Sequence, residues 1–287
     1  MRYIGKKVTG MPATDGAGVK LKRVIGSPAL DMVDPFLMLD EFGSDDPESW
    51  IAGFPEHPHR GFETVTIMLD GRVKHADSVG NQGVIEAGDV QWMTAGSGII
   101  HSEMPERADG RLRGFQLWVN LPGRLKMIAP RYQDVRASRI ASASRNGATV
   151  RVIAGEGFGV KGAADTLMPV RLLDVAIDAN AAFEIDVTDE HACFVYVYDG
   201  EVRGTDRSGK PVDIASGSLG VLVGTDGVRL EAGESGAKLL FADGRPIREP
   251  VARHGPFVMN TREEVQKAFA DYSRGELVGA LQPAIGQ

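Results

Sequence analysis

An internal repeat at one constant spacing constrains the fold more than any other feature of this sequence. The dipeptide Asp70-Gly71 recurs as Asp199-Gly200. Single residues recur at the same spacing, namely Val73 and Val202, Gly80 and Gly209, Ile85 and Ile214, and Gly88 and Gly217. A repeat unit this long indicates two copies of one domain rather than a solenoid of short units. One offset without a gap relates residues 57–103 to residues 186–232, and we place the two domains at residues 1–145 and 146–287.

The repeated domain is predicted to consist of β-strands. The segments Phe62–Leu69, Gly114–Leu121 and Ala192–Tyr198 are short and rich in β-branched and aromatic residues, a composition typical of strands. Asp-Gly dipeptides follow several such segments and favour hairpin turns, because they readily adopt positive φ. The 36 glycines and 15 prolines are spread along the chain, which suits many short strands. The sequence therefore predicts an all-β protein with two similar lobes.

The carboxyl-terminal region differs, because it carries a helix signature. Thr261 followed three residues later by Glu264 matches a capping box. Apolar residues then recur at helical spacing, at Val265, Ala268, Phe269 and Tyr272. We expect one amphipathic helix that begins near Arg262 and packs its apolar face over one of the sheets, with a structural role.

Charge and cysteine content exclude several classes of function. A net charge of −7 and a pI near 5.5 argue against direct binding of nucleic acid. Cys193 is the single cysteine, so neither an internal disulfide nor a thiolate zinc cluster can form. The amino terminus lacks the apolar stretch of a secretory signal, and no apolar run is long enough to span a bilayer. We expect a soluble cytoplasmic protein that does not bind membranes, and a monomer, because two lobes in one chain can replace the pairing of single-domain proteins.

Two histidine-containing pairs have the spacing of metal ligands. His57 and His59 are two residues apart, as are His101 and Glu103. Residues i and i+2 of a strand point to the same face about 6.5–7 Å apart along the chain, so two imidazoles can reach one ion at bond lengths of ~2.0–2.2 Å. Three imidazoles and a carboxylate suit Fe(II), with Mn, Ni, Cu or Zn as substitutes. His57 and His59 alone are also compatible with a surface pair in a proline-containing loop, but two such pairs in a β-rich repeat favour one divalent metal ion.

The other histidines and the second copy of the repeat limit the number of sites. We expect His75, His191 and His254 to be hydrogen-bonded or solvent-facing. The constant offset of the repeat places four non-ligand residues at the positions of the proposed ligands, namely Asp186, Thr188, Leu230 and Ala232. Since a scaffold needs the turns but only the chemistry needs the histidines, we expect one metal per chain, in the first domain.

The sequence around these histidines resembles the pirin family of the cupin superfamily. The segments that carry the resemblance are His57–Glu63, Gly88–Gly98, His101–Pro105, Asp34–Phe42, Gln116–Pro122 and Gly255–Thr261. They span nearly the whole chain. The resemblance implies a bicupin, that is, two jelly-roll lobes, each a barrel or sandwich of β-strands, with a carboxyl-terminal helix. The first lobe would bind the metal, and the second would be free of metal.

In pirins the metal, usually iron, is held by the residues that match His57, His59, His101 and Glu103. The general cupin pattern would instead place the carboxylate ligand at Glu63, which strand parity puts on the same face as His57 and His59. Thr94-Ala95-Gly96 replaces the usual Pro-x-Gly turn, and His101 comes two residues later than that pattern predicts. The resemblance to pirins favours Glu103 as the ligand and leaves Glu63 as an outer group or an alternative ligand.

The resemblance implies quercetin 2,3-dioxygenase activity, in which O2 cleaves the central ring of a flavonol and carbon monoxide is released. The partners would then be O2 and a flavonol-like aromatic small molecule, with Glu103, or Glu63, as general base for the 3-hydroxyl proton. A flat substrate needs an apolar pocket, for which the candidates are Phe36, Met38, Trp92 and Phe115.

A non-enzymatic function is the alternative. Some pirins are implicated as iron-dependent cofactors of transcription regulators or as partners of metabolic enzymes. The chain would then be a regulatory or adaptor protein with a protein partner, and its acidic charge suits that role better than reading DNA. A metal-dependent isomerase of small sugars, another cupin activity, is a more distant possibility. Turnover that depends on the metal site would separate the enzyme from the adaptor.

Overall fold

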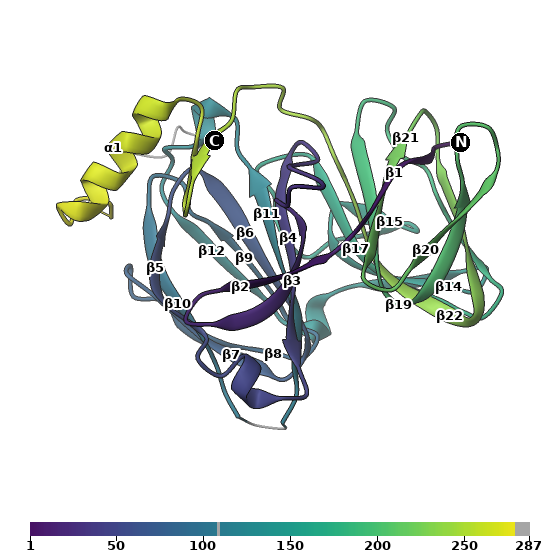
Figure 1. Ribbon diagram of the computed structural model, residues 1–287, viewed down its shortest axis with the longest axis horizontal. Coiled ribbons are helices and arrows are strands. Elements are labelled where there is room, and N and C mark those ends of the chain that lie inside the picture. The colour runs from purple at the N-terminus through teal and green to yellow at the C-terminus, as the bar shows by residue number, and fades with distance from the viewer. Residues whose placement is uncertain (108–109, 279–287) are drawn as a thin grey trace. The chain divides into compact units, whose positions relative to one another are not determined.

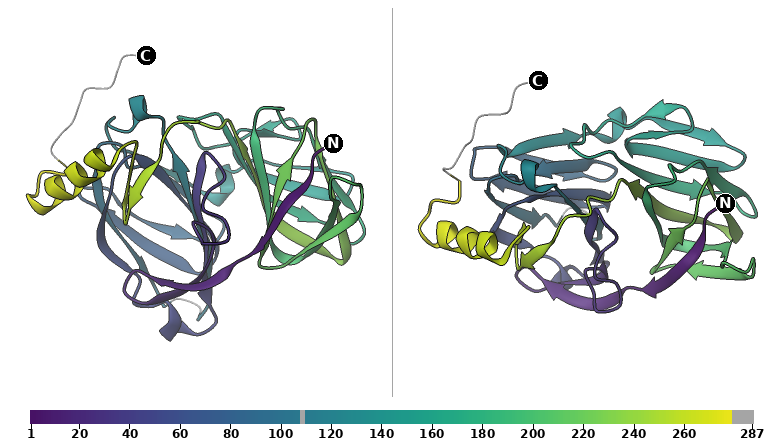
Figure 2. Two further views of the ribbon diagram at one scale, coloured as in Figure 1. Left: turned by 45° about the horizontal axis from the view of Figure 1, so that its top comes forward. Right: turned by 90° about the horizontal axis from the view of Figure 1, so that it is seen from above.

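The computed structural model describes residues 1–107 and 110–278, which fold into two compact units (Figures 1 and 2). The histidine unit comprises Pro12–Arg23, Phe36–Ala137 and the described residues from Ile247. The companion unit comprises Met1–Met11, Val24–Pro35 and Ser138–Pro246. The compact units therefore do not follow one cut in the sequence. Each end of the chain belongs to the unit formed mainly by the other half. The division into domains at residues 1–145 and 146–287 stays a prediction.

Two sheets and a hairpin build the histidine unit. Its seven-stranded sheet has the order β12-β9-β6-β11-β4-β3-β2, with bounds Arg131–Val135, Val90–Thr94, Phe62–Asp70, Leu112–Asn120, Phe36–Ser44, Val19–Ile25 and Met11–Asp15. Its four-stranded sheet has the order β5-β10-β7-β8, with bounds Phe54–His59, Ile99–Pro105, Arg72–Asp77 and Gln82–Glu86. The hairpin consists of β23 and β24, Ala252–His254 and Phe257–Met259. Short 3₁₀ turns are η1, η2 and η3, at Pro47–Ser49, Gly123–Leu125 and Ala137–Arg139.

A nine-stranded sheet forms most of the companion unit. Its main order is β1-β21-β19-β22-β17-β14-β13, with β18 paired to β22 and β20 paired to β19. In that order, followed by β18 and β20, the bounds are Tyr3–Thr9, Ser218–Val223, Ala192–Thr205, Val228–Gly244, Val170–Ile177, Ala148–Ala154, Ser142–Arg145, Ala182–Ile185 and Pro211–Ala215. A two-stranded ribbon joins β15 and β16, Glu156–Gly157 and Val160–Lys161. The strand orders of the described residues are open, so both units are sandwich-like rather than closed barrels. The expected all-β fold is confirmed.

The turns of the two units confirm the internal repeat in detail. Gly71 and Gly200 both have positive φ, 75° and 69°. The amide of Gly88 donates to the carbonyl of Met68, and at the equivalent place in the second copy the amide of Gly217 donates to the carbonyl of Val197. Gly71 separates β6 from β7, whereas β19 runs through Gly200 with an irregular register. The Asp-Gly turn is thus a corner at which the strand changes layer, and only glycine takes its conformation without strain.

Strand pairing corrects the constant offset at the positions of the proposed ligands. Val73 pairs with Pro105, but its repeat equivalent Val202 pairs with Ala232, so the offset on this strand is two residues shorter. His101 and Glu103 therefore correspond to Val228 and Leu230. The partner of Val228 is Ile185, which takes the place of His57, and Val187 lies two residues beyond. The repeat continues through the ligand strands, but with a different register from the one that the sequence alone predicts.

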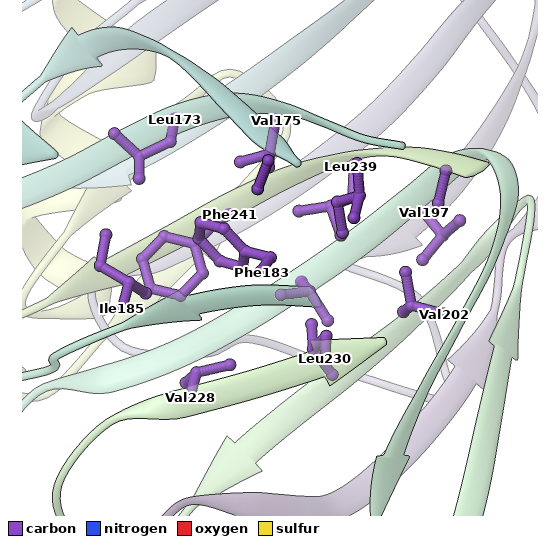
Figure 3. Close-up of a cluster of buried hydrophobic side chains, with 14 of the residues drawn as sticks. Leu173, Val175, Phe183, Ile185, Val197, Val202, Val228, Leu230, Leu239 and Phe241 are labelled. Carbon is purple, nitrogen blue, oxygen red and sulfur yellow. The ribbon is translucent and has the colours of Figure 1, made fainter. Parts of the chain in front are cut away.

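These equivalent positions lie in the apolar core of the companion unit. Ile185, Val187, Val228 and Leu230 are buried in one cluster with Phe183 and Phe241. Figure 3 shows Val228 and Leu230 on neighbouring parts of one strand, facing these aromatic rings. The space that the histidines occupy in one unit is thus filled by aliphatic and aromatic side chains in the other.

The carboxyl-terminal helix α1, Arg262–Ser273, begins where the capping box predicts. The Thr261 side chain accepts a hydrogen bond from the amide of Glu264, and the Glu264 side chain accepts one from the amide of Thr261. α1 packs on the β23–β24 hairpin in the histidine unit, next to β5 in Figure 1. Its buried face differs from the apolar pattern, because Asp271 is buried whereas Phe269 and Tyr272 stay partly exposed. Among the described residues, α1 and the shorter turns include no helix with the length and hydropathy needed to cross a membrane.

Candidate metal centre

The two predicted ligand pairs lie on adjacent strands of the four-stranded sheet. His57 and His59 are on β5, and His101 and Glu103 are on β10. The strands are antiparallel, with His101 directly opposite His57. Directly opposite side chains share one face of a sheet, and the i, i+2 spacing adds His59 and Glu103 to that face. Pairing of β5 with β10 therefore brings distant parts of the sequence to one place.

The three imidazoles gather as the sequence predicts. Their candidate ligand atoms all lie within 4.8 Å of one another. The ring centroids of His57 and His101 are 4.4 Å apart, those of His57 and His59 4.7 Å, and those of His59 and His101 5.0 Å. Among residues 1–107 and 110–278, these three histidines form the group of side chains with the geometry of a metal site.

Hydrogen bonds to backbone carbonyls orient two of the rings. His57 Nδ1 lies 2.8 Å from Pro55 O, and His59 Nδ1 lies 3.4 Å from Pro256 O. A carbonyl only accepts, so the hydrogen must be on Nδ1, and Nε2 is left with a lone pair for a metal. Both ring nitrogens of His101 are buried without a hydrogen-bond partner. An orphaned imidazole beside two rings with free Nε2 lone pairs fits a divalent ion held by three nitrogens.

Burial keeps two of these rings in the form that binds metal. Burial, reinforced by His57, lowers the pKa of His59 well below its usual value. Burial also lowers the pKa of His101, with His59 and His57 acting in the same direction. Both imidazoles are therefore neutral near pH 7, as metal coordination requires.

Glu103 is near this cluster but does not belong to the group of close ligand atoms. Thr66 Oγ1 donates to Glu103 Oε1 at 2.8 Å, and Gln116 Nε2 donates to Oε2 at 3.2 Å. Thr66 and Gln116 come from β6 and β11 of the facing sheet. The carboxylate is thus fixed between the two sheets, and its role as a ligand stays a prediction.

Glu63 is placed differently from what strand parity predicted. The chain turns at Gly61, whose φ is 91°, and passes from β5 into β6 of the other sheet. Parity along one strand therefore does not relate Glu63 to His57 and His59. Glu63 is fully buried and accepts a hydrogen bond of 2.7 Å from Thr94. Its role as an alternative ligand or base stays a proposal.

The aromatic residues nearest the cluster were not among the predicted pocket residues. The rings of Phe62 and Trp118 lie 5.1 and 5.4 Å from the ring of His59. Among the four candidates, Met38 is opposite Trp118, and Phe36 is opposite Val119, beyond an irregularity in the register. Trp92 and Phe115 are opposite Val65 and Ile67, on the face of the seven-stranded sheet that points away from Thr66. The alternation of Gln116 and Trp118 with Phe115, Leu117 and Val119 was the available signal for the two faces.

His75 contradicts the prediction that it is hydrogen-bonded or solvent-facing. It is fully buried, its ring nitrogens make no hydrogen bond, and Nε2 lies 3.9 Å from Asp77 Oδ2. Its ring lies 5.4 Å from that of His101 and 4.6 Å from that of Tyr132. Burial lowers the pKa of His75, although Glu103 and other carboxylates act against it. The alternation of His75 with Val73 on β7 could have placed it inside.

The other two histidines agree with the prediction, since His191 contacts Asp243 at 2.6 Å and His254 is exposed.

Comparison with known proteins assigns both halves of the chain. The pirin family model matches residues 18–119, and the model of the pirin C-terminal cupin domain matches residues 172–278. A pirin-like protein from Caulobacter vibrioides is 50% identical over 283 residues, which cover 96% of this chain and 99% of that protein. A Pseudomonas aeruginosa protein, provisionally named a quercetin 2,3-dioxygenase, is 45% identical over 277 residues, which cover 94% of this chain and 95% of that protein.

A solved structure with the same fold extends this likeness to three dimensions. The crystal structure of a quercetin 2,3-dioxygenase from Acinetobacter baumannii has a TM-score of 0.87 and 33% identity, and the match covers 98% of this chain and 100% of that one. The predicted pair of cupin-type domains with a carboxyl-terminal helix is thus confirmed. Family models and relatives that together span nearly the whole sequence show that this chain belongs to the pirin family.

Proposed function

We propose that this pirin is a metal-dependent dioxygenase that cleaves flavonol-like substrates with O2, as a quercetin 2,3-dioxygenase does. The observation that carries the proposal is the cluster of His57, His59 and His101, with ligand atoms within 4.8 Å of one another. The relative and the solved structure that bear this enzyme name support the reaction class. The substrate, the metal and the reaction remain parts of the proposal.

The proposed ion is Fe(II), held by the three imidazoles with Glu103 as the fourth ligand. A nitrogen-rich set with one carboxylate suits iron, and Mn, Ni, Cu or Zn could occupy the same donors. Glu103 is the proposed carboxylate because it follows His101 by two residues on the same face of β10. A bound divalent ion would supply Lewis acidity for the flavonol oxygen and electrons for reaction with O2.

Glu103 is also the proposed acceptor of the 3-hydroxyl proton of the flavonol. The hydrogen bonds from Thr66 and Gln116 hold the carboxylate in one orientation, so that little reorganisation is needed when the proton is transferred. Its burial excludes bulk water, which would otherwise solvate the carboxylate and weaken it as a base. Glu63, held by Thr94, is the less favoured alternative, because it alternates with Thr66 on β6 and so lies on the opposite face of that strand.

The substrate is proposed to approach from the side of His57 and Trp118. These two side chains are partly exposed, whereas His59, His101 and Phe62 are buried. Phe62 and Trp118 lie against each other with ring centroids 4.3 Å apart. A flat aromatic molecule can stack on such rings, which is why a flavonol-like substrate fits this side of the centre.

Aerobic consumption of quercetin by the iron-reconstituted protein tests the proposal. We expect loss of the flavonol absorbance together with release of carbon monoxide, and neither in His101→Ala. Circular dichroism of His101→Ala should remain that of a β-protein, because the companion unit has aliphatic residues at the equivalent positions. No turnover in protein with a full complement of iron would contradict the enzyme and favour the metal-dependent adaptor.

The variant Glu103→Gln tests the proposed base. It should keep part of its iron, since three imidazoles remain, and lose turnover by about 10²-fold or more, the usual contribution of general base catalysis. The matched variant Glu63→Gln should change turnover less. The reverse order of the two effects would transfer the role of base to Glu63.

A further inference from the structure

The carboxyl-terminal residues contact the metal centre through the turn that follows its second histidine. Val258 donates its amide to the carbonyl of Arg60 at 3.1 Å, and Phe257 forms a parallel bridge with Arg60. The carbonyl of Pro256 accepts from His59 Nδ1. The segment just before α1 therefore supplies the hydrogen bond that orients one of the three imidazoles.

The side chain of Arg60 joins both ligand strands to α1. Its Nε donates to Ser97 O at 2.6 Å, and Ser97 lies in the turn that leads to His101. Its Nη1 donates to Asp271 Oδ2 at 2.8 Å, and Nη2 donates to Leu277 O at 3.4 Å. Arg60 and Asp271 are both nearly inaccessible to solvent, with side chains 1% and 6% exposed. A guanidinium buried this deeply is held in one position by its partners.

Glycines at the ends of the ligand strands let the carboxyl-terminal residues come this close. A Cβ on Gly61, two residues after His59, would lie 2.0 Å from Val258 O. A Cβ on Gly98, three residues before His101, would lie 2.5 Å from Leu277 O. Both glycines have positive φ. The sequence thus keeps side chains away at the two places where this backbone contacts the ligand strands.

A buried lysine forms a third connection. Lys126 Nζ donates to Gly61 O at 2.8 Å, to Val258 O at 3.0 Å and to Asn120 Oδ1 at 2.7 Å. One ammonium group therefore bridges the turn after β5 and the β24 strand. Apolar contacts complete the attachment, because Phe257, Ala268 and Leu277 form one cluster with Ile100, the residue before His101.

We propose that Pro256–Leu277, the carboxyl-terminal arm, is a positioning element of the metal centre. The inference rests on the proposed metal site. The pairing of β5 with β10 has its own hydrogen bonds, so the strands do not need the arm to stay together. The arm instead fixes the ring of His59 through Pro256, and the turns next to both ligand strands through Arg60 and Lys126.

Isothermal titration with Ni²⁺ tests the arm without any turnover. Asp271→Asn removes the charge that holds Arg60, and it should weaken nickel binding about tenfold, the lower end of what outer groups of a metal site contribute. Asp271 also accepts from Lys267, which is exposed. Lys267→Ala is the matched variant and should bind nickel as the wild type does.

A second control separates positioning from general stability. Thr261→Ala removes the cap of α1 and should lower the melting temperature, yet leave the nickel affinity within about twofold of wild type. If Asp271→Asn is not folded, Lys126→Met releases the arm at Val258 without touching α1, and the same loss of affinity is expected.

Wild-type nickel affinity in a folded Asp271→Asn or Lys126→Met protein would overturn the proposal. So would an equal loss of affinity in Thr261→Ala and Asp271→Asn at equal loss of melting temperature, because the arm would then act only through stability. A wild type that binds nickel but, when fully loaded with iron, does not consume quercetin would contradict the proposed enzyme and leave this inference intact.

Discussion

Lys126 is the buried residue with the clearest electrostatic consequence for the fold. Its side chain is enclosed among three oxygen acceptors, which match the three N–H groups of an ammonium ion. Burial lowers its pKa to about 7, although Glu249 and Glu264 act in the opposite direction. Charge on Lys126 therefore costs stability in the folded state that it does not cost in the unfolded chain.

The variant Lys126→Met tests this cost through pH. Between pH 7 and the ordinary lysine pKa, folded Lys126 is neutral while unfolded Lys126 is charged, so the unfolded state binds more protons. The free energy of unfolding of the wild type, measured relative to Lys126→Met, should therefore rise from pH 7 to pH 9.5 by up to about 1.4 kcal/mol per unit. Urea unfolding at several pH values measures it. A difference that stays constant with pH would contradict the account.

The sequence predicts the place of a residue only where the deciding contacts lie on the same strand. The i, i+2 spacing of His57 and His59 was enough to predict a shared face, because both are on one strand. His75 was misjudged because its neighbours His101 and Tyr132 come from other strands, and nothing in the sequence fixes their register. Glu63 was misplaced because the parity argument assumed a continuous strand across Gly61, where the chain changes sheets.

Strand β11 shows how one element serves the core and the site with opposite faces. Gln116 and Trp118 face β10 and the histidines, whereas Phe115 and Leu117 face the other way and are fully buried. Cross-strand neighbours extend the polar side, since Gln91, Thr66, Gln116 and Asp40 lie opposite one another on β9, β6, β11 and β4. A polar row on the inner face of a sandwich indicates chemistry rather than packing, because buried polar groups cost stability unless they are paired.

Two variants of β11 separate these roles. Phe115→Ala should lower the free energy of unfolding by about 3–5 kcal/mol through the cavity it leaves, with little effect on the turnover of folded protein. Gln116→Leu should lower the stability by only about 1–2 kcal/mol but reduce kcat about tenfold, since Glu103 loses one of its two hydrogen-bond donors. Denaturant unfolding and quercetin turnover measure the pair. Equal effects of the two variants on kcat would contradict the assignment of the faces.

The position of a whole element was easier to predict than the residues it packs against. The capping box located the start of α1 because a cap is a local interaction within four residues. The burial of Asp271 in that helix could not be predicted, because its partner Arg60 is 211 residues away in the sequence. The apolar spacing correctly placed Phe269 and Tyr272 on the packed side of the helix, where both rings lie against Phe257. It left out the ion pair that is buried on the same side.

At the scale of the molecule, the two units repeat one fold but use its equivalent positions differently. These positions hold packed apolar side chains in the companion unit and the proposed metal ligands in the histidine unit. The corners at Gly71 and Gly200 keep the same conformation, and the repeat was visible in the sequence because such turns require glycine. The offset is two residues shorter on the strand of His101 and one residue shorter on the strand of His57, which only the pairings of Val202 with Ala232 and of Ile185 with Val228 reveal. The pairing shows that the companion unit has an aliphatic residue at each of these ligand positions. Ile185, Val228 and Leu230 stand there in place of His57, His101 and Glu103.

The amount of iron bound per chain tests this account most directly. The protein and its His101→Val variant, which copies the residue at the equivalent position of the companion unit, are loaded with Fe(II) without oxygen, desalted, and measured by elemental analysis. We predict one iron per chain in the wild type and none in His101→Val, with the same β-sheet circular dichroism in both. Two irons per chain, or iron retained by His101→Val, would contradict a single centre built on His57, His59 and His101.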